Sequence, residues 1–223
     1  ILVCLVGSEM CIRDRTTRFP DLKITGLCHE IASMSRQLPT LMETDLDNIQ
    51  FEAGGLNHFS ILLHATYKDS GKDGYPLINK NFEGYYSDLV NDHEGFFSNA
   101  GAERGLFFEL FKRYGYLPIT TDSHLGEYLS WAYSVADHDG ILDFYDKYKK
   151  RCLSFFSNDG YEQFFDMSHP EPHERAIPII ESIVADLNML EHAVNIKNEN
   201  FIECLPNDIV VEVPAIILSL IHI

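Results

Sequence analysis

Gly26-Leu27-Cys28-His29-Glu30 and Gly54-Gly55-Leu56-Asn57-His58 are the two stretches of sequence that best define how the chain folds. Each is led by glycine, borders an apolar run and ends in side chains that can bind a metal. Ile24 to Leu27 is typical of the end of a buried strand, so we expect Cys28 just past its C-terminal edge, where open α/β sheets bind ligands. A thiolate and an imidazole suit borderline divalent ions such as zinc, cobalt or manganese. Two protein ligands leave coordination positions open, which is the arrangement of a catalytic site rather than a closed structural one.

Spacing alone favours a plainer alternative for both residues. Cys28 is then a small buried hydrophobic side chain, and His58 is a histidine at the start of a helix. The sequence spacing by itself leaves both interpretations open.

Composition limits the class of protein. The chain has 223 residues, of which 45% are hydrophobic, enough for one sizeable core. The net charge of −17 argues against a nucleic-acid partner and favours solubility. The sequence contains no apolar run of the length that spans a membrane. The five cysteines form no CxxC pair, which fits a reducing compartment. We therefore expect a soluble, cytoplasmic protein with no membrane or nucleic-acid partner.

Both ends of the chain differ from a natural domain. Residues 1–15, ILVCLVGSEMCIRDR, resemble translated sequencing-adaptor tails, and residues 216–223 look like the same kind of artefact. The opening has no basic n-region and charged residues follow it soon, so a signal peptide is not indicated. We expect the fold to lie in residues 16–215, as an internal piece of a longer chain.

The pattern along the chain predicts an α+β fold with one core and no internal repeat. Residues 59–67 fit either a buried strand or a helix that begins at Asn57, and periodicity does not decide between them. Strands are predicted at 19–27, 46–52, 202–205 and 209–213. Helices are predicted at 31–36, 103–114, with Gly115 as C-cap, 125–133, 139–150 and 177–190.

Several blocks of this sequence, taken together, resemble glycoside hydrolase family 4, the NAD- and manganese-dependent glycosidases. The blocks are Leu27-Cys28-His29, residues 53–58, 108–116, 124–128 and 211–215, within a resemblance that covers 19–215. It implies the C-terminal part of a Rossmann-like α/β enzyme related to lactate and malate dehydrogenases. No GxGxxG turn is present, so we expect that the dinucleotide-binding half is missing and that this piece is inactive by itself. The resemblance also implies that the full-length parent is a dimer or tetramer.

The chemistry that the resemblance implies is not the two-carboxylate mechanism, to which this family is an exception. NAD takes a hydride from C3 of the sugar, a base removes the proton on C2, and the aglycone leaves from C1. Water then adds before the hydride is returned. The metal stabilises the enolate as a Lewis acid.

Residue by residue, Cys28 and His58 match the two metal ligands of the family. Asn57 matches a contact to sugar hydroxyls, with a helix N-cap as its plainer role. His29 would assist the leaving group or bind a hydroxyl, with a solvated histidine as the alternative. Arg104 and His124 are predicted substrate contacts.

Asp122 is the predicted C2 base, although a helix cap explains it equally well. Tyr75 and Tyr128 are the other candidates, because phenolate bases also occur in this family.

The Cys28-His29 sequence favours unphosphorylated α-glycosides as substrates. An acidic Glu30 near the site would repel a substrate carboxylate, which favours an α-galactoside or α-glucoside over an α-galacturonide or α-glucuronide. Two alternatives remain at this point: an NAD oxidoreductase like the lactate and malate dehydrogenases, whose active sites lack a metal, and a non-catalytic module that binds metal through four ligands.

Overall fold

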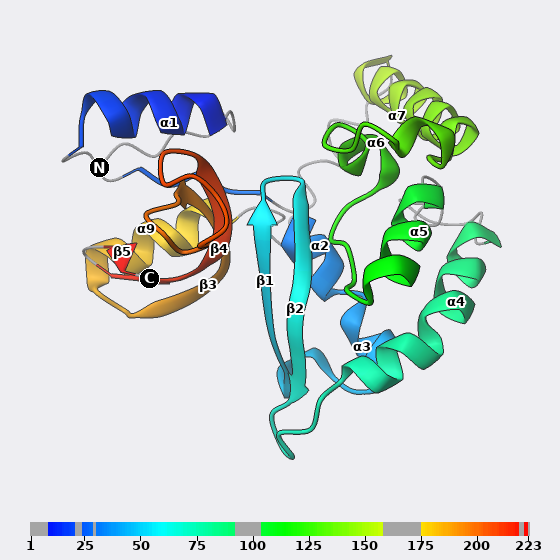
Figure 1. Ribbon diagram of the computed structural model, residues 1–223, viewed down its shortest axis with the longest axis horizontal. Helices are drawn as coiled ribbons and strands as arrows, with labels where there is room; N and C mark the ends of the chain where they lie inside the picture. Colours follow the sequence, from blue (N-terminus) through cyan, green and yellow to red (C-terminus); the bar gives the residue numbers. More distant parts are fainter. Residues whose placement is uncertain are drawn as a thin grey trace.

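The β1–β2 hairpin stands between two groups of elements (Figure 1). The computed structural model describes residues 9–20, 24–28, 30–91, 104–157, 175–218 and 221–222. The helices are α1 (Glu9–Arg18), α2 (Glu30–Ser35), α3 (Leu38–Met42), α4 (Tyr75–Asn91), α5 (Gly105–Tyr114), α6 (Asp122–Leu125), α7 (His138–Ser157) and α9 (Ala176–Ala185), with 3-10 turns η1 (Leu46–Asn48) and η2 (Ala132–Ser134). The strands are β1 (Ile49–Leu56), β2 (Phe59–Tyr67), β3 (Met189–Lys197), β4 (Val210–Ile217) and β5 (Ile221–His222). The predicted α+β class is confirmed.

The hairpin resolves the ambiguity over residues 59–67, which form a strand. β1 and β2 pair antiparallel from Ile49↔Tyr67 to Leu56↔Phe59. The turn between them is Asn57-His58, so Asn57 caps no helix; His58 has a left-handed φ of 59°. The predicted strand 46–52 begins later and extends further, since β1 runs from Ile49 to Leu56 and includes Gly54 and Gly55.

Gly55 is required by a close approach of backbone. Its φ is +153°, and a Cβ there would lie 2.5 Å from the Phe59 carbonyl oxygen on the returning strand. Only glycine combines this backbone conformation with so short a distance between strands. The glycine therefore allows β1 and β2 to meet closely, next to the Asn57-His58 turn.

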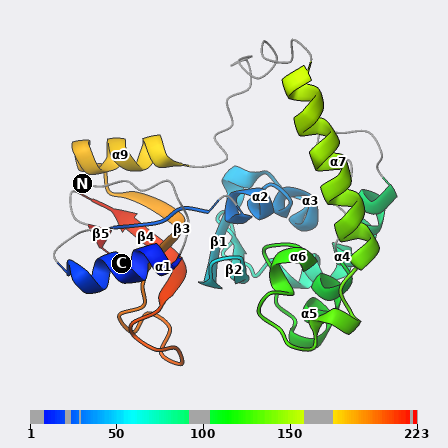
Figure 2. The same cartoon turned by 90° about the horizontal axis from the view of Figure 1, so that it is seen from above.

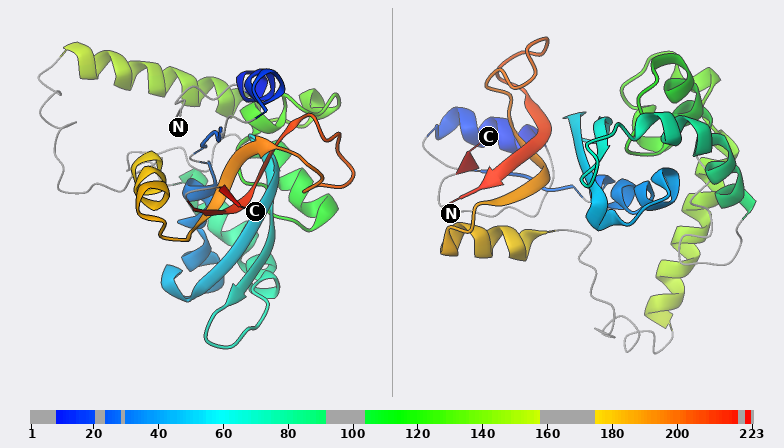
Figure 3. Two further views of the ribbon diagram at one scale, coloured as in Figure 1. Left: turned by 90° about the vertical axis from the view of Figure 1, so that its left-hand side faces the viewer. Right: turned by 90° about the horizontal axis from the view of Figure 1, so that it is seen from below.

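The sheet has the strand order β2-β1-β4-β3, with β5 paired to β4 (Figure 3). β1 meets β4 at Gly55↔Glu212, and β3 pairs with β4 through Asn195↔Glu212. An isolated bridge joins Gly26 to Asn195, and Gly55 pairs with Ser60 on β2. One row of five residues thus runs across the sheet: Gly26, Asn195, Glu212, Gly55, Ser60.

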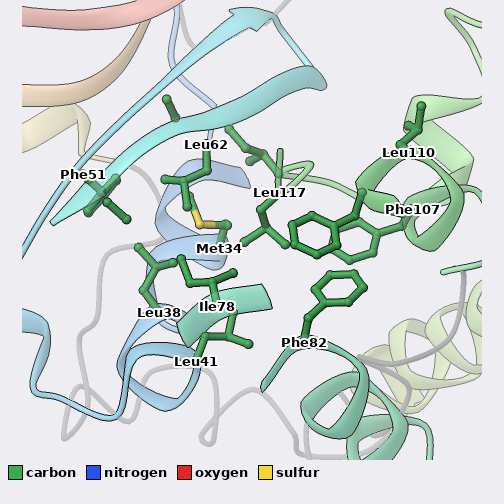
Figure 4. Close-up of a cluster of buried hydrophobic side chains, with 14 of the residues drawn as sticks. Met34, Leu38, Leu41, Phe51, Leu62, Ile78, Phe82, Phe107, Leu110 and Leu117 are labelled. Atoms are coloured by element: carbon green, nitrogen blue, oxygen red, sulfur yellow. The ribbon is translucent and has the colours of Figure 1, made fainter. Parts of the chain in front are cut away.

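The larger hydrophobic core lies between the hairpin and helices α2 to α5 (Figure 4). The helix α5 places Phe107 and Phe111 on its buried face, and both stack on Phe82 of α4, with ring centroids 5.7 and 3.9 Å away. Leu62 of β2 is fully buried in the same cluster. The predicted C-cap is confirmed, since Gly115 ends α5 with a φ of 72°.

A second core lies between α9 and strands β3 and β4. Val211 and Val213 face Ile179 of α9, whereas Val210 points to the opposite face and packs with Ile12 of α1. Figure 2 shows α1 and α9 on opposite sides of these strands. Successive residues of a strand point to opposite faces, so one strand supports both helices. The assignment of residues 1–15 and 216–223 to artefact stays a prediction; residues 9–18 form α1, and β5 pairs with β4.

Other predicted elements need correction. Residues 19–27 form no continuous strand among the residues described there; only Gly26 is bridged. Residues 202–205 lie in turns. The predicted helix 177–190 ends at Ala185, because Asp186 and Asn188 adopt left-handed φ values of 53° and 55°, which Asp and Asn tolerate well, and β3 follows. The helix expected at 125–133 is instead the short α6 followed by a turn and η2.

Among the described residues, no helix combines the length and apolar character needed to cross a membrane.

Candidate functional site

Four of the predicted site residues meet at the β1–β2 turn. The ring of His58 lies against the ring of His124, with centroids 4.2 Å apart and planes inclined by 47°. The Tyr128 hydroxyl donates a hydrogen bond to the Asn57 carbonyl oxygen at 2.6 Å. Tyr128 also packs against Phe59, with ring centroids 5.0 Å apart. The segment that follows α5 therefore folds back over the turn. It brings the imidazole of His124 and the phenol of Tyr128 next to Asn57 and His58.

Cys28 lines a cavity beside β1 and β3. Its side chain is half-buried, and the cavity, of about 550 Å³, also includes Phe51, from the first half of β1, and His192 of β3. His58 follows the C-terminal end of β1, and Gly26, two residues before Cys28, lies in the same row of the sheet as Gly55 near that end. His29 lies outside the described residues, so its predicted role stays a prediction.

The charged and aromatic side chains that line this cavity contact one another. Arg175 Nε donates to both carboxylate oxygens of Glu191, at 2.8 and 3.0 Å. Burial raises the pKa of Glu191, and Arg175 opposes this rise. His192 stacks on Phe51 with centroids 4.1 Å apart. Burial lowers the pKa of His192, and the positive charges of Arg175 and Lys68 lower it further. The cavity therefore favours a neutral imidazole at His192, next to a carboxylate whose charge is balanced by Arg175.

A buried polar network crosses the sheet behind the turn. Asn195 Nδ2 donates to Asn57 Oδ1 and to Glu212 Oε2, both at 3.4 Å. The Ser60 hydroxyl lies 2.8 Å from Glu212 Oε1. The sequence interpretation gave no role to Asn195, Glu212 or Ser60. The available signal was a polar residue between two apolar neighbours, as in Val194-Asn195-Ile196 and Val211-Glu212-Val213.

The carboxylate of Asp122 is hydrogen-bonded to backbone N–H groups of neighbouring elements. Asp122 is almost fully buried, at 1% exposure. It accepts hydrogen bonds from the N–H groups of Leu106 and Phe107, at 2.8 and 2.9 Å, and from the N–H of Asp137 at 2.8 Å. Asp122 thus caps α5 rather than the helix expected at 125–133. This geometry favours the capping role, and the C2 base assigned to Asp122 stays an untested prediction.

Tyr75 is held inside the helical core. Its hydroxyl donates to the Leu62 carbonyl oxygen and accepts from the Leu117 N–H at 3.3 Å. Burial raises the pKa of Tyr75 to about 12. A phenol with this pKa is a proton donor at neutral pH, which disfavours Tyr75 as the base.

Arg104, a predicted substrate contact, is also buried. Its guanidinium lies over the rings of Phe107 and Tyr86, 4.4 and 5.2 Å from their centroids, and Nη1 donates to the Thr120 carbonyl oxygen at 3.4 Å. These cation–π contacts give Arg104 a packing role at the start of α5.

The chemistry of Cys28 and His58 fits a divalent ion, since sulfur and imidazole nitrogen are suitable ligands. In the described part of the chain, no group of three or more His, Cys, Asp or Glu side chains lies close enough to hold a metal. A pair of protein ligands fits an ion whose other positions are taken by substrate or water, as in catalytic sites.

Fold and site together define a mixed α+β domain with a polar site at the turn of a central hairpin. Residues 53–219 match the model of the "Family 4 glycosyl hydrolase C-terminal domain", and the chain belongs to this family. The resemblance seen in the sequence is confirmed.

Two relatives and one solved structure illustrate the likeness. An α-glucosidase of Erwinia rhapontici is 42% identical over 90% of this chain and 48% of its own length. An α-galacturonidase of Lachnoclostridium phytofermentans is 25% identical over 93% of this chain and 48% of its own. A 6-phospho-α-glucosidase from gut microorganisms, solved in complex with NAD and Mn²⁺, matches with a TM-score of 0.60 at 18% identity, over 94% of this chain and 48% of that one. The chain thus spans about half the length of the curated relatives it matches.

Proposed function

We propose that the full-length protein containing this chain hydrolyses unphosphorylated α-glycosides, α-glucosides first and α-galactosides second. The observation that carries the proposal is the 42% identity to an α-glucosidase over 90% of this chain. Membership of a glycosidase family favours hydrolysis over the dehydrogenase and the non-catalytic metal module.

The cofactors in this proposal are NAD and Mn²⁺, supported by the family and by the solved relative that contains both. NAD would accept and return the hydride at C3, and Mn²⁺ would act as a Lewis acid on the sugar oxygens. Cys28 and His58 would hold the ion. Because they come from different segments of the chain, each is tested by its own substitution.

The remaining roles belong to residues around the turn. Asn57 would bind a sugar hydroxyl, and His124, against His58, would contact the substrate. Tyr128 is the best placed of the three candidate bases, since its side chain is 41% exposed and lies at the turn, whereas Asp122 and Tyr75 are bound inside the fold. His29 remains the candidate for assisting the leaving group.

The test uses the full-length protein and release of p-nitrophenol from the α-glucoside, α-galactoside and α-galacturonide, with and without NAD, Mn²⁺ and a reductant. We expect α-glucoside turnover that requires both cofactors. Since loss of a group that only orients a metal ligand costs about 10–100-fold, loss of a ligand itself in Cys28→Ser or His58→Ala should lower turnover by at least about 100-fold. Turnover without NAD would overturn the redox mechanism. Preference for the α-galacturonide would replace the neutral substrate by the acidic one.

The metal is tested separately with Co²⁺, whose thiolate charge-transfer absorption reports a bound cysteine. We expect this absorption in the wild type and its loss in Cys28→Ser, while Cys204→Ser, an exposed cysteine, keeps it. A weakened absorption in His58→Ala would place both residues on one ion; an unchanged spectrum and affinity would remove His58 from the metal.

The proposed assembly is a homo-oligomer in the cytoplasm. Size-exclusion chromatography with light scattering on the full-length protein tests the first part, and a monomer would contradict it.

A further inference from the structure

Asn195 connects the two segments that carry the predicted metal ligands. Its backbone N–H and C=O exchange hydrogen bonds with those of Gly26, both at 2.9 Å. Its side chain donates to Asn57 Oδ1 at 3.4 Å. Gly26 lies two residues before Cys28, and Asn57 immediately precedes His58. A single residue on β3 therefore contacts both segments.

Glu212 determines how the Asn195 carboxamide is oriented. The atom of Asn195 that faces Glu212 Oε2 is the NH₂ group, because this oxygen accepts the bond. The same NH₂ group faces Asn57, so the atom of Asn57 that receives it must be the carbonyl oxygen. Both contacts are 3.4 Å long, and the two N–H groups of the amide serve one acceptor each.

An unsatisfied atom shows that this orientation is imposed. Asn195 is 3% exposed, and its Oδ1 has no hydrogen-bond partner in the described part of the chain. A buried carbonyl without a partner costs free energy. The amide keeps this arrangement because rotating it would place its oxygen against the oxygens of Glu212 and Asn57. Ser60 holds Glu212 in turn.

We propose that Glu212 and Asn195 are positioning residues that fix the Asn57 carboxamide with its oxygen toward the sheet, which makes its NH₂ group the donor to a sugar oxygen. The inference rests on the proposed function, in which Asn57 binds the substrate. Glu212 and Asn195 act through Asn57 and do not touch the sugar themselves.

The test is Glu212→Gln in the full-length protein. Gln has nearly the same shape but can present either an oxygen or an NH₂ group. The amides of Asn195 and Asn57 would then be free to flip, exchanging their oxygen and NH₂ positions. Sugar binding is measured by calorimetry with methyl α-glucoside and Mn²⁺ but without NAD, which prevents turnover. We expect Kd and KM to rise about tenfold, with kcat changed less than about twofold, as when binding common to ground and transition states is lost.

The control is Glu52→Gln, on the exposed side of β1, which should change neither constant. The melting temperature and the Co²⁺ spectrum report any general disturbance of the fold or of the metal.

A double-mutant cycle separates positioning from a structural role. If Glu212 acts through Asn57, Asn57→Ala combined with Glu212→Gln binds the sugar as weakly as Asn57→Ala alone. Additive losses, or an unchanged Kd in Glu212→Gln, would overturn the inference. Sugar binding without NAD-dependent turnover would overturn the proposed function alone, and no binding of any glycoside by the wild type would overturn both.

Discussion

The helical core and the polar row across the sheet hold the molecule by opposite physical means. In the core, rings such as Phe82, Phe107 and Phe111 stack inside a hydrophobic cluster. In the row, Asn195 and Glu212 are as deeply buried as the core side chains but are held by directional hydrogen bonds. The orientation of the Asn195 amide leaves its own Oδ1 without a partner among the described residues. Apolar burial contributes stability without orientation, whereas a buried polar network gives orientation at a cost in stability. The row lies next to the candidate site, where orientation matters most.

The largest expected effect comes from a cavity in the helical core. Leu62→Ala removes a fully buried side chain beside Met34 and Leu117. We expect a loss of about 2–5 kcal/mol in the free energy of unfolding, measured with urea. Leu142→Ala, at 67% exposure, is the matched control and should change stability by less than about 0.5 kcal/mol. Equal losses at both positions would contradict the assigned core.

Asp122→Asn tests a buried polar group that serves the core rather than the site. Asn has one oxygen where the carboxylate uses two for three backbone N–H groups, so at least one donor is left unpaired. We expect a loss of about 1–3 kcal/mol in the free energy of unfolding. Glu127→Gln, an exposed neighbour, should have no measurable effect. If Asp122→Asn abolished turnover while leaving stability unchanged, Asp122 would be the base and not the cap.

The third prediction concerns pH. The pKa of His192 is lowered in the folded state by burial, so its contribution to stability is present above its unfolded value, 6.5, and is lost as the pH falls through the folded pKa. We expect stability to fall with decreasing pH below about 6.5, and His192→Gln to reduce this fall. Glu191, whose pKa is raised, acts in the opposite sense: its contribution is present below 4.5 and is lost as the pH rises through its folded pKa.

The smallest expected change in stability compares two tyrosines. Tyr75→Phe removes one hydroxyl from the helical core, and we expect a loss of about 1 kcal/mol with no change in the pH–rate profile. Tyr128→Phe removes the hydroxyl that contacts the Asn57 carbonyl. The free energy of unfolding of Tyr128→Phe should fall by a similar amount, and its kcat should fall strongly if Tyr128 is the base. The reverse pattern, with kcat lost only in Tyr75→Phe, would move the base into the core.

Much of the fold was accessible from local pattern. The apolar face of α5 and Gly115 as its cap are properties of neighbouring residues, and both predictions hold. The end of α9 at Ala185 could not be predicted in this way. Asp186 and Asn188 are residue types that a helix can contain, and only their left-handed conformation shows that the helix has ended. The pattern of residues 59–67 could not distinguish strand from helix, and only pairing with β1 decided it. The candidate site shows the same division: His58 and His124 could be named from the sequence, but their contact depends on the chain folding back over the turn.

The sequence by itself determined the family, through blocks of residues whose order and spacing are recognisable without any structure. It also named Cys28 and His58 as candidate ligands, through their match to the metal ligands of that family. Only the tertiary structure showed which groups Asp122, Asn195 and Glu212 contact. A buried carboxylate or amide has the same sequence signature whether it caps a helix, orients a neighbour or acts in catalysis. Its role is set by the donors and acceptors around it, and these come from segments distant in sequence.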